Sequence, residues 1–220
     1  AATTAVLLSM FFYRLTDIDI DAYVGIAVAV LIFVAGGRVL NDAKNAILGE
    51  APSKETLDAI RAKVKECGAD FGAAFDGDAD RCGFIDDKGE IIPMDLFTAL
   101  IAQDILSRGP ATILYDLRSS RAVPECIRSL GGTPIQSRVG HAFIKAQMRE
   151  TGAVFAGELS GHYYFKQNFT AESQGLAMVM LANLICSKKQ PLHELIAPLR
   201  KYFSSGEVNS KVADVQPILD

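Results

Sequence analysis

Three aspartates, each separated from the next by one small residue, have the clearest capacity for chemistry in this sequence. They are Asp76, Asp78 and Asp80, and Arg81 follows at once. Carboxylate oxygens on alternate residues of a tight loop can converge on one hard cation, so the pattern favours magnesium or calcium. Acidic turns between strands commonly face water, and this spacing alone leaves a solvated turn as an equal alternative. A calcium EF-hand is excluded because Arg81 stands at the sixth loop position, which needs glycine.

A second polar loop, residues 157–162, directly follows an apolar strand pattern. Its glycines allow the backbone to approach a ligand closely. Glu158, Ser160 and His162 combine an acceptor, a hydroxyl and a donor that can switch. Neighbouring sugar hydroxyls need this mixture of groups. An ordinary polar turn is the alternative for this loop taken alone.

Two further polar loops carry Arg118 and His141, and each follows another predicted strand. Either residue taken singly fits a surface or capping role equally well. Lys145 lies one helical turn beyond His141 and has the same two interpretations. All of these loops fall at strand ends, which is where sheets covered by helices bind ligands.

The elements that must position these loops alternate between strands and helices from Cys67 onward. This alternation predicts an α/β fold with mixed sheet layers flanked by helices. Strands are predicted at 71–75, 82–85, 90–92, 111–115, 133–136, 153–156 and 163–165. Helices are predicted at 53–66, 93–108, 122–130, 142–149, 174–186 and 191–203.

The composition limits the partners and the redox state. The net charge of −4 argues against a general attraction to nucleic acid. The four cysteines show no paired spacing, which indicates free thiols.

Residues 22–37 are uncharged and almost entirely apolar. This run is borderline for a bilayer helix, which wants roughly 20 apolar residues, and a buried helix is the alternative.

The whole stretch from Gly68 to Arg81 resembles the metal-binding loop of the α-D-phosphohexomutases, the phosphomannomutase/phosphoglucomutase family. The resemblance implies that the three aspartates hold Mg²⁺ and that Arg81 lies at the transferring phosphoryl group. The loop 157–162 resembles the sugar-recognition loop of the family's third domain. The resemblance implies substrate contacts for Arg118, Glu158, Ser160 and His162, and an active-site role for His141.

The resemblance covers residues 63 to about 215 and implies a domain organisation. Residues 63–107 correspond to the end of the second mutase domain, 108–208 to the third, and 209–220 to a linker. The implied activity is an isomerase reaction that moves a phosphoryl group between O1 and O6 of a mannose or glucose phosphate through a phosphoserine. The phosphoserine loop and the fourth-domain phosphate loop are not recognisable here, so we expect no turnover from this chain alone. A non-catalytic sugar-phosphate-binding module is the alternative.

Residues 1–55 resemble the last two membrane helices of cation diffusion facilitator transporters, on Asp19–Ile32 and Ile47–Pro52. The resemblance implies an apolar helical hairpin, with arms at 5–13 and 22–40, and a membrane association through residues 1–40. A remnant of a divalent-cation transporter is therefore a further alternative for the chain. The join between the two resemblances is expected within 51–63, and the mutase part is expected in the cytoplasm.

Overall fold

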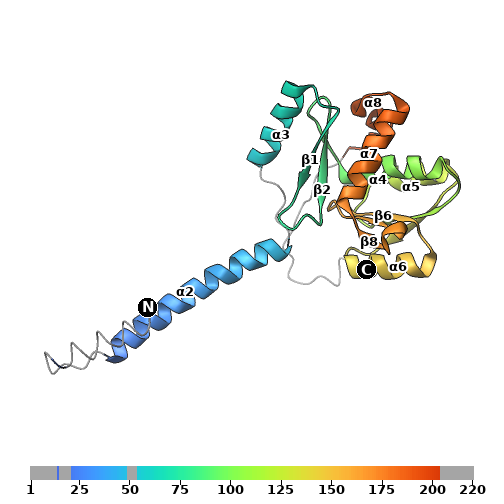
Figure 1. Cartoon of the computed structure of the whole chain (residues 1–220). Coiled ribbons are helices and arrows are strands. Elements are labelled where there is room, and N and C mark those ends of the chain that lie inside the picture. The colour runs from blue at the N-terminus through green and yellow to red at the C-terminus, as the bar shows by residue number, and fades with distance from the viewer. Residues whose placement is uncertain (1–13, 15–20, 49–53, 204–220) are drawn as a thin grey trace. The chain divides into compact units, whose positions relative to one another are not determined.

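A computed structural model describes Arg14 and residues 21–48 and 54–203. The chain divides into two compact units, Ala1–Ala51 and Pro52–Asp220. The main described element of the first unit is a helix, α2 (Asp21–Leu48), drawn in blue in Figure 1. The helix expected at 22–40 is therefore confirmed as a helix and extends to Leu48. The other arm of the predicted hairpin, residues 5–13, lies outside the described residues.

The membrane-spanning helix predicted for the first unit is not found among the described residues. Within 21–48 and 54–203, no helix is both long enough and apolar enough to cross a membrane. The reason lies in the second half of α2, where Arg38, Asp42 and Lys44 interrupt the apolar sequence. The uncharged run therefore ends before the roughly 20 residues that a bilayer core requires. The membrane association inferred for residues 1–40 loses its basis with this helix.

The second unit begins with a small antiparallel sheet. Its strands are β1 (Phe71–Phe75), β2 (Cys82–Asp86) and β3 (Ile91–Ile92), in the order β1-β2-β3. Helix α3 (Lys54–Cys67) packs directly on β1: a methyl group added at Gly72 would lie 2.8 Å from side-chain carbons of Ile60 and Val64. The sheet thus carries the loop 76–81 between its two longer strands.

A larger mixed sheet follows, with the strand order β5-β4-β6-β7-β8. The strands β4, β5 and β6 are parallel, β7 pairs antiparallel with β6, and β8 pairs antiparallel with β7. This arrangement confirms the predicted mixed sheet; the short β8 and the 3-10 turn η1 were not predicted. The bounds are β4 (Thr112–Asp116), β5 (Thr133–Ser137), β6 (Phe155–Gly157), β7 (Tyr163–Phe165), η1 (Lys166–Asn168) and β8 (Ala171–Glu172).

Helices cover both faces of this sheet (Figure 1). Alternate side chains of a strand point to opposite faces, and on β4 Ile113 belongs to the larger core whereas Leu114 belongs to the smaller one. The larger core includes α4 (Met94–Leu106), α5 (Ala122–Ser129) and α7 (Gln174–Lys188). The smaller core includes α6 (His141–Thr151).

Helix α4 joins the two sheets through aromatic rings. Phe97 on α4 stacks on Phe84 of β2 with ring centroids 4.2 Å apart, and it lies 4.7 Å from the ring of Tyr163 on β7. All three side chains are fully buried. Offset and tilted ring pairs of this kind add stability beyond the area that they bury. The two sheets therefore share one core.

The predicted helix at 191–203 is corrected. It is a single short helix, α8 (Leu192–Ile196), followed by a 3-10 turn, η2 (Ala197–Leu199). Pro198 lacks the backbone N–H that would continue the helix, which explains the change.

Asp87, in the turn after β2, joins the small sheet to the start of α8. Its carboxylate accepts the backbone N–H of His193 at 2.9 Å, and its second oxygen lies 2.7 Å from the His193 ring Nδ1. Burial acts to raise the pKa of Asp87, but the hydrogen bonds from the main chain and ring of His193 outweigh it, so the pKa lies below its usual range. This contact therefore favours the ionised carboxylate.

Candidate metal and sugar site

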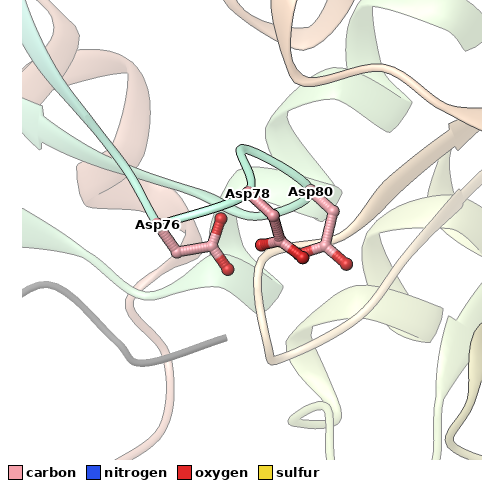
Figure 2. A group of neighbouring side chains, drawn as sticks. All are labelled: Asp76, Asp78 and Asp80. Atoms are coloured by element: carbon pink, nitrogen blue, oxygen red, sulfur yellow. The ribbon is translucent and has the colours of Figure 1, made fainter. Parts of the chain in front are cut away.

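The three aspartates of loop 76–81 converge, as Figure 2 shows. Asp76, Asp78 and Asp80 each offer one carboxylate oxygen, and these oxygens lie within 4.8 Å of one another. The loop is tight because Ala79 takes a left-handed conformation (φ 61°) and its N–H bonds to the carbonyl of Asp76 at 3.3 Å. The Arg81 N–H also donates to Asp76 Oδ1 at 3.2 Å. The fold thus brings the predicted ligand set together.

Two oxygens of this cluster fit the role of cation ligands. Asp76 Oδ2 and Asp80 Oδ1 are buried and have no hydrogen-bond partner among the described residues. Each lies near the Arg81 Nε, at 3.7 and 3.8 Å, which is too long for a hydrogen bond. Buried oxygen atoms without donors are costly, and an all-oxygen donor set suits Mg²⁺ or Ca²⁺.

The neighbouring Cys82 is not a ligand candidate. Burial raises the pKa of its thiol to about 12, so the thiol stays protonated at neutral pH. Cys67, Cys82, Cys126 and Cys186 are all free, as predicted.

The loop 157–162 has a backbone shape that requires its glycines. A Cβ at Gly157 would lie 2.1 Å from the Thr98 hydroxyl of α4, so only glycine fits beneath this helix. Gly161 has a φ of 91° and faces the Cys82 carbonyl. The Cys82 N–H in turn donates to the Gly161 carbonyl at 3.0 Å. The main chains of the two polar loops are therefore bonded to each other.

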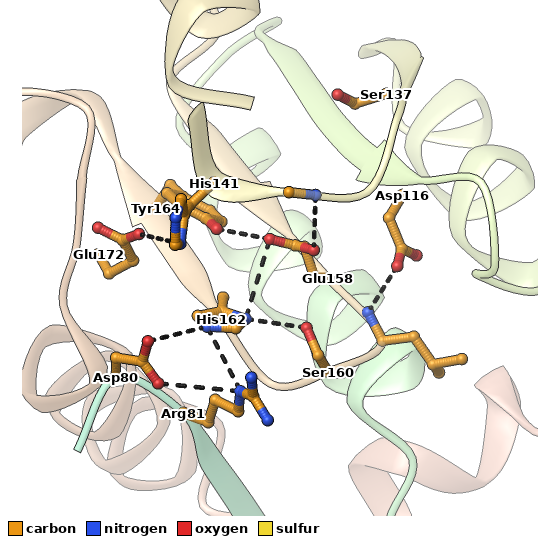
Figure 3. A network of polar contacts seen from close by, with 12 residues as sticks. Asp80, Arg81, Asp116, Ser137, His141, Glu158, Ser160, His162, Tyr164 and Glu172 are labelled. Carbon is orange, nitrogen blue, oxygen red and sulfur yellow. Dashed lines mark hydrogen bonds and ion pairs between the residues drawn. The ribbon is translucent and has the colours of Figure 1, made fainter. Parts of the chain in front are cut away.

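Side chains complete this junction (Figure 3). His162 Nε2 lies 3.2 Å from Asp80 Oδ2 and 3.5 Å from Arg81 Nε. The other ring nitrogen, Nδ1, lies 2.8 Å from the Ser160 hydroxyl. The side-chain amide of Gln174, at the start of α7, donates to the Asp80 carbonyl. The predicted metal residues and predicted sugar residues thus form one continuous cluster.

Glu158 is held in this cluster by groups on two other elements. Its carboxylate is 2% exposed and accepts the Tyr164 hydroxyl at 2.5 Å and the Gly140 N–H at 3.4 Å. Arg118 Nη2 lies 4.0 Å away. Burial and the bond to the Glu158 carboxylate raise the pKa of Tyr164, which keeps it a donor. One carboxylate oxygen therefore faces the positive loops that follow β4 and β5.

Arg118 is brought to the same place by Asp116, the last residue of β4. Asp116 Oδ2 accepts Arg118 Nε at 2.9 Å, and it also accepts the N–H of Leu159 at 3.2 Å. Asp116 is completely buried, whereas the Arg118 side chain is 39% exposed. The guanidinium thus has one anchored edge and one edge open to a ligand.

His141 lies on the opposite side of the cluster, at the start of α6. Its ring is 6.4 Å from that of His162, and its Nδ1 is 3.8 Å from Glu172, which also pairs with Lys145 at 2.5 Å. A cleft of about 380 Å³ joins these groups to the aspartate loop. Its lining residues are Asp78, Ala79, Asp80, His141, Lys145, Glu172, Ser173 and Gln174.

Four residues of this network were not predicted to take part: Asp116, Tyr164, Glu172 and Gln174. The sequence could have indicated Tyr164, because it lies two residues after His162 and side chains two residues apart on a strand point to the same face. It could also have indicated Asp116, as a carboxylate at the end of an apolar strand. Glu172 and Gln174 lie on a short strand and a helix start whose placement depends on the tertiary fold.

The fold and the joined loops define an α/β protein with an acidic loop in contact with a second polar loop. The comparison with family models then identifies the family to which this α/β protein belongs. The model for phosphoglucomutase/phosphomannomutase, alpha/beta/alpha domain III, matches residues 93–202, which is half of the chain. The model for alpha/beta/alpha domain II of the same family matches residues 41–89. The chain belongs to the phosphoglucomutase/phosphomannomutase family, which confirms the main resemblance.

Individual relatives agree. The chain is 45% identical to a phosphomannomutase of Methanocaldococcus jannaschii and 40% identical to one of Escherichia coli, in each case over 74% of this chain and 36% of the relative. A crystal structure of a phosphoglucomutase/phosphomannomutase family protein from Burkholderia thailandensis matches with 38% identity and a TM-score of 0.61, over 67% of this chain and 32% of that one. The chain spans about a third of the length of these relatives.

The transporter resemblance is corrected by the same comparison. The domain II model begins at residue 41 and so includes residues 47–52, which carried half of the transporter resemblance. The other half depended on a membrane helix, which the described residues do not contain. A remnant of a cation transporter is therefore not supported. The two family models meet between residues 89 and 93, whereas the resemblance implied a domain boundary at 107/108.

Proposed function

We propose that this chain provides the metal and sugar parts of a phosphohexomutase site. Asp76, Asp78 and Asp80 hold Mg²⁺, and a mannose or glucose phosphate binds at the loop 157–162. The reaction served is the transfer of a phosphoryl group between O1 and O6 of the hexose. The donor is a phosphoserine, which the family resemblance assigns to a domain other than the two matched here.

One observation carries this proposal: His162 of the sugar loop lies 3.2 Å from Asp80 of the metal loop. The proposal needs the metal within reach of the sugar, because a phosphoryl group in transit must touch both. Two loops separated by packed core would have excluded it.

The groups around the cleft stabilise the transferring phosphoryl group through their positive charge. Bound Mg²⁺ offsets negative charge on the phosphoryl oxygens. Arg81 adds positive charge beside the aspartates, and His141 does so when protonated, from the other side of the cleft. Cationic and hydrogen-bonding groups fixed in advance in this way are the main source of catalysis in phosphoryl transfer.

Sugar recognition falls to the second loop and Arg118. Glu158 accepts hydrogen bonds from hexose hydroxyls, and Ser160 and His162 can donate or accept. Arg118 offers the open edge of its guanidinium to the phosphate or to a hydroxyl. A cytoplasmic location stays a prediction for this part of the chain.

Calorimetric titration tests the proposal. We expect Mg²⁺ to bind to the chain, and mannose 1-phosphate or glucose 1-phosphate to bind more tightly when Mg²⁺ is present. The variant Glu158→Gln should weaken sugar binding and leave Mg²⁺ binding unchanged. Glu150→Gln, at the exposed end of α6, is the matched control. Equal affinity for hexose phosphate and inorganic phosphate in all three proteins would contradict the sugar site.

Turnover is measured separately, with a hexose bisphosphate as activator. Because no turnover is expected from this chain alone, binding without turnover is compatible with both the proposed mutase part and the alternative of a sugar-phosphate-binding module. Turnover that is lost in Glu158→Gln would favour the mutase.

A further inference from the structure

The carboxylate of Asp116 has several partners in the site, and Asp116 is not among the residues that line the cleft. It is completely buried at the end of β4. Its oxygens accept from the Nε and Nη2 of Arg118, both at 2.9 Å, and from the Ser119 hydroxyl at 2.6 Å. These donors belong to the loop that follows its own strand.

The fourth donor comes from the other loop. The backbone N–H of Leu159, 43 residues further along the chain, donates to Asp116 Oδ2 at 3.2 Å. Leu159 stands between Glu158 and Ser160, the two residues proposed to hold the hexose. The same oxygen atom therefore bonds to the guanidinium of Arg118 and to the backbone of the sugar loop.

This bonding is needed for the carboxylate to be buried. An ionised carboxylate without partners is strongly unfavourable in a protein interior, and hydrogen bonds that involve a charge are shorter and stronger than neutral ones. Two of the four donors are nitrogens of the Arg118 guanidinium, which is partly exposed to water. The remaining two fix the directions of the loops, because each requires its loop to approach one defined oxygen.

We propose that Asp116 is a positioning residue that sets Arg118 and the loop 157–162 at a fixed spacing around the hexose. This role rests on the proposed function. Asp116 acts through Arg118 and Leu159, and has no contact of its own with the ligand. Without it, Arg118 and Glu158 remain in the protein but no longer hold their relative position, which costs binding because recognition requires both at once.

Three variants of the full chain test the proposal. Asp116→Ala removes the shared acceptor. Asp116→Asn keeps its shape and one oxygen and is the conservative variant. Asp86→Ala is the matched control, because Asp86 is also buried (3% exposed) and accepts two backbone N–H groups, but it does so in the turn after β2, away from the site.

Two exchange rates report the positions of Arg118 and of the loop 157–162 in the absence of ligand. Hydrogen exchange of the Leu159 amide and of the Arg118 Nε–H is followed by NMR, and mannose 1-phosphate binding is measured by calorimetry with Mg²⁺ present. We expect Asp116→Ala to speed both exchange rates and weaken sugar-phosphate binding by about 10- to 100-fold, the range for loss of a hydrogen bond to a charged group. Asp116→Asn should recover part of each loss. Asp86→Ala should change neither exchange rate nor binding.

The outcomes separate this proposal from the proposed function. If Asp116→Ala stays folded with both exchange rates unchanged, Asp116 does not position the loops and the inference is overturned. If both rates rise in Asp86→Ala as well, the effect is one of general stability, and the inference is also overturned. If the unaltered chain does not bind mannose 1-phosphate at all, the proposed sugar site fails, while the exchange rates still decide whether Asp116 ties the two loops together.

Discussion

The two polar loops that meet in this site are built in opposite ways. In the loop 157–162, each polar side chain has a partner: Glu158 bonds to Tyr164, and Ser160 bonds to His162. In the loop 76–81, buried oxygens of Asp76 and Asp80 have no hydrogen-bond partner among the described residues. A loop with all of its bonds made is shaped before its ligand arrives, whereas a loop with unpaired oxygens is completed by a cation. The hydrogen bonds within the protein therefore shape the loop 157–162, whereas the carboxylates of the loop 76–81 leave oxygens that suit a cation.

The largest expected effect comes from removing a ligand from the incomplete loop. Asp78 is the most exposed of the three aspartates, so Asp78→Asn should cost little stability. We expect it to weaken Mg²⁺ binding by at least about 100-fold, because even partners of metal ligands are worth 10- to 100-fold. Calorimetry measures the affinity, with Asp58→Asn on α3 as the control. Unchanged affinity in Asp78→Asn would show that the loop is an ordinary acidic turn.

The junction between the loops is the next most sensitive point. Gly161→Ala forces a side chain onto a φ of 91° and places its Cβ 3.1 Å from the Cys82 carbonyl. We expect a loss of about 2 kcal/mol in the free energy of unfolding, within the range for strained backbone. Urea denaturation measures it. Gly175→Ala is the control, because nothing lies within 4 Å of its added carbon and no positive φ is required there; equal losses in both variants would contradict the strain.

The adjacent tyrosines of β7 test how much the bond to Glu158 contributes to the stability of the preformed loop 157–162. Both are completely buried, but the Tyr164 hydroxyl bonds to Glu158 whereas the Tyr163 hydroxyl has no partner among the described residues. Tyr164→Phe should therefore lower the stability by about 1 kcal/mol, because it removes a donor to a buried carboxylate. Tyr163→Phe should be neutral or stabilising. Thermal unfolding of the two variants, together with sugar-phosphate binding, measures the difference, and a reversed order would show that the bond to Glu158 is unimportant.

The smallest effect lies away from both loops, at the Asp87–His193 contact. The pKa of Asp87 is lowered in the folded protein, so its ionised form stabilises the fold above the pKa of the unfolded chain. That contribution is lost as the pH falls through the lower, folded pKa, which lies below the usual value of 3.8. Asp87→Asn should therefore be less stable at neutral pH and show a weaker loss on acidification. Denaturation midpoints from pH 7 to pH 2 measure this, and parallel curves for the two proteins would contradict it.

Much of this site could be predicted from the sequence, because its chemistry is local. The spacing of Asp76, Asp78 and Asp80 requires a tight loop, and the fold brings their oxygens together. The expected meeting of this loop with the sugar loop is also found, between Asp80 and His162. The roles of these residues toward metal and hexose stay predictions.

What could not be predicted depends on distant partners. Asp116 accepts a hydrogen bond from Leu159, 43 residues away, and no local pattern indicates that pairing. For the apolar region of α2, length and hydropathy were borderline, and the resemblance favoured a membrane helix that the described residues do not contain.

The ring contacts among Phe84, Phe97 and Tyr163 have a consequence for the way in which this part of the protein moves and melts. They join Phe84, in the part matched by the domain II model, to Phe97 and Tyr163, in the part matched by the domain III model, and the two matches meet between residues 89 and 93. Hinge bending at that point would expose three large aromatic surfaces to water, so we expect none. Residues 54–203 should instead denature in a single cooperative step, with the metal loop and the sugar loop lost at the same temperature.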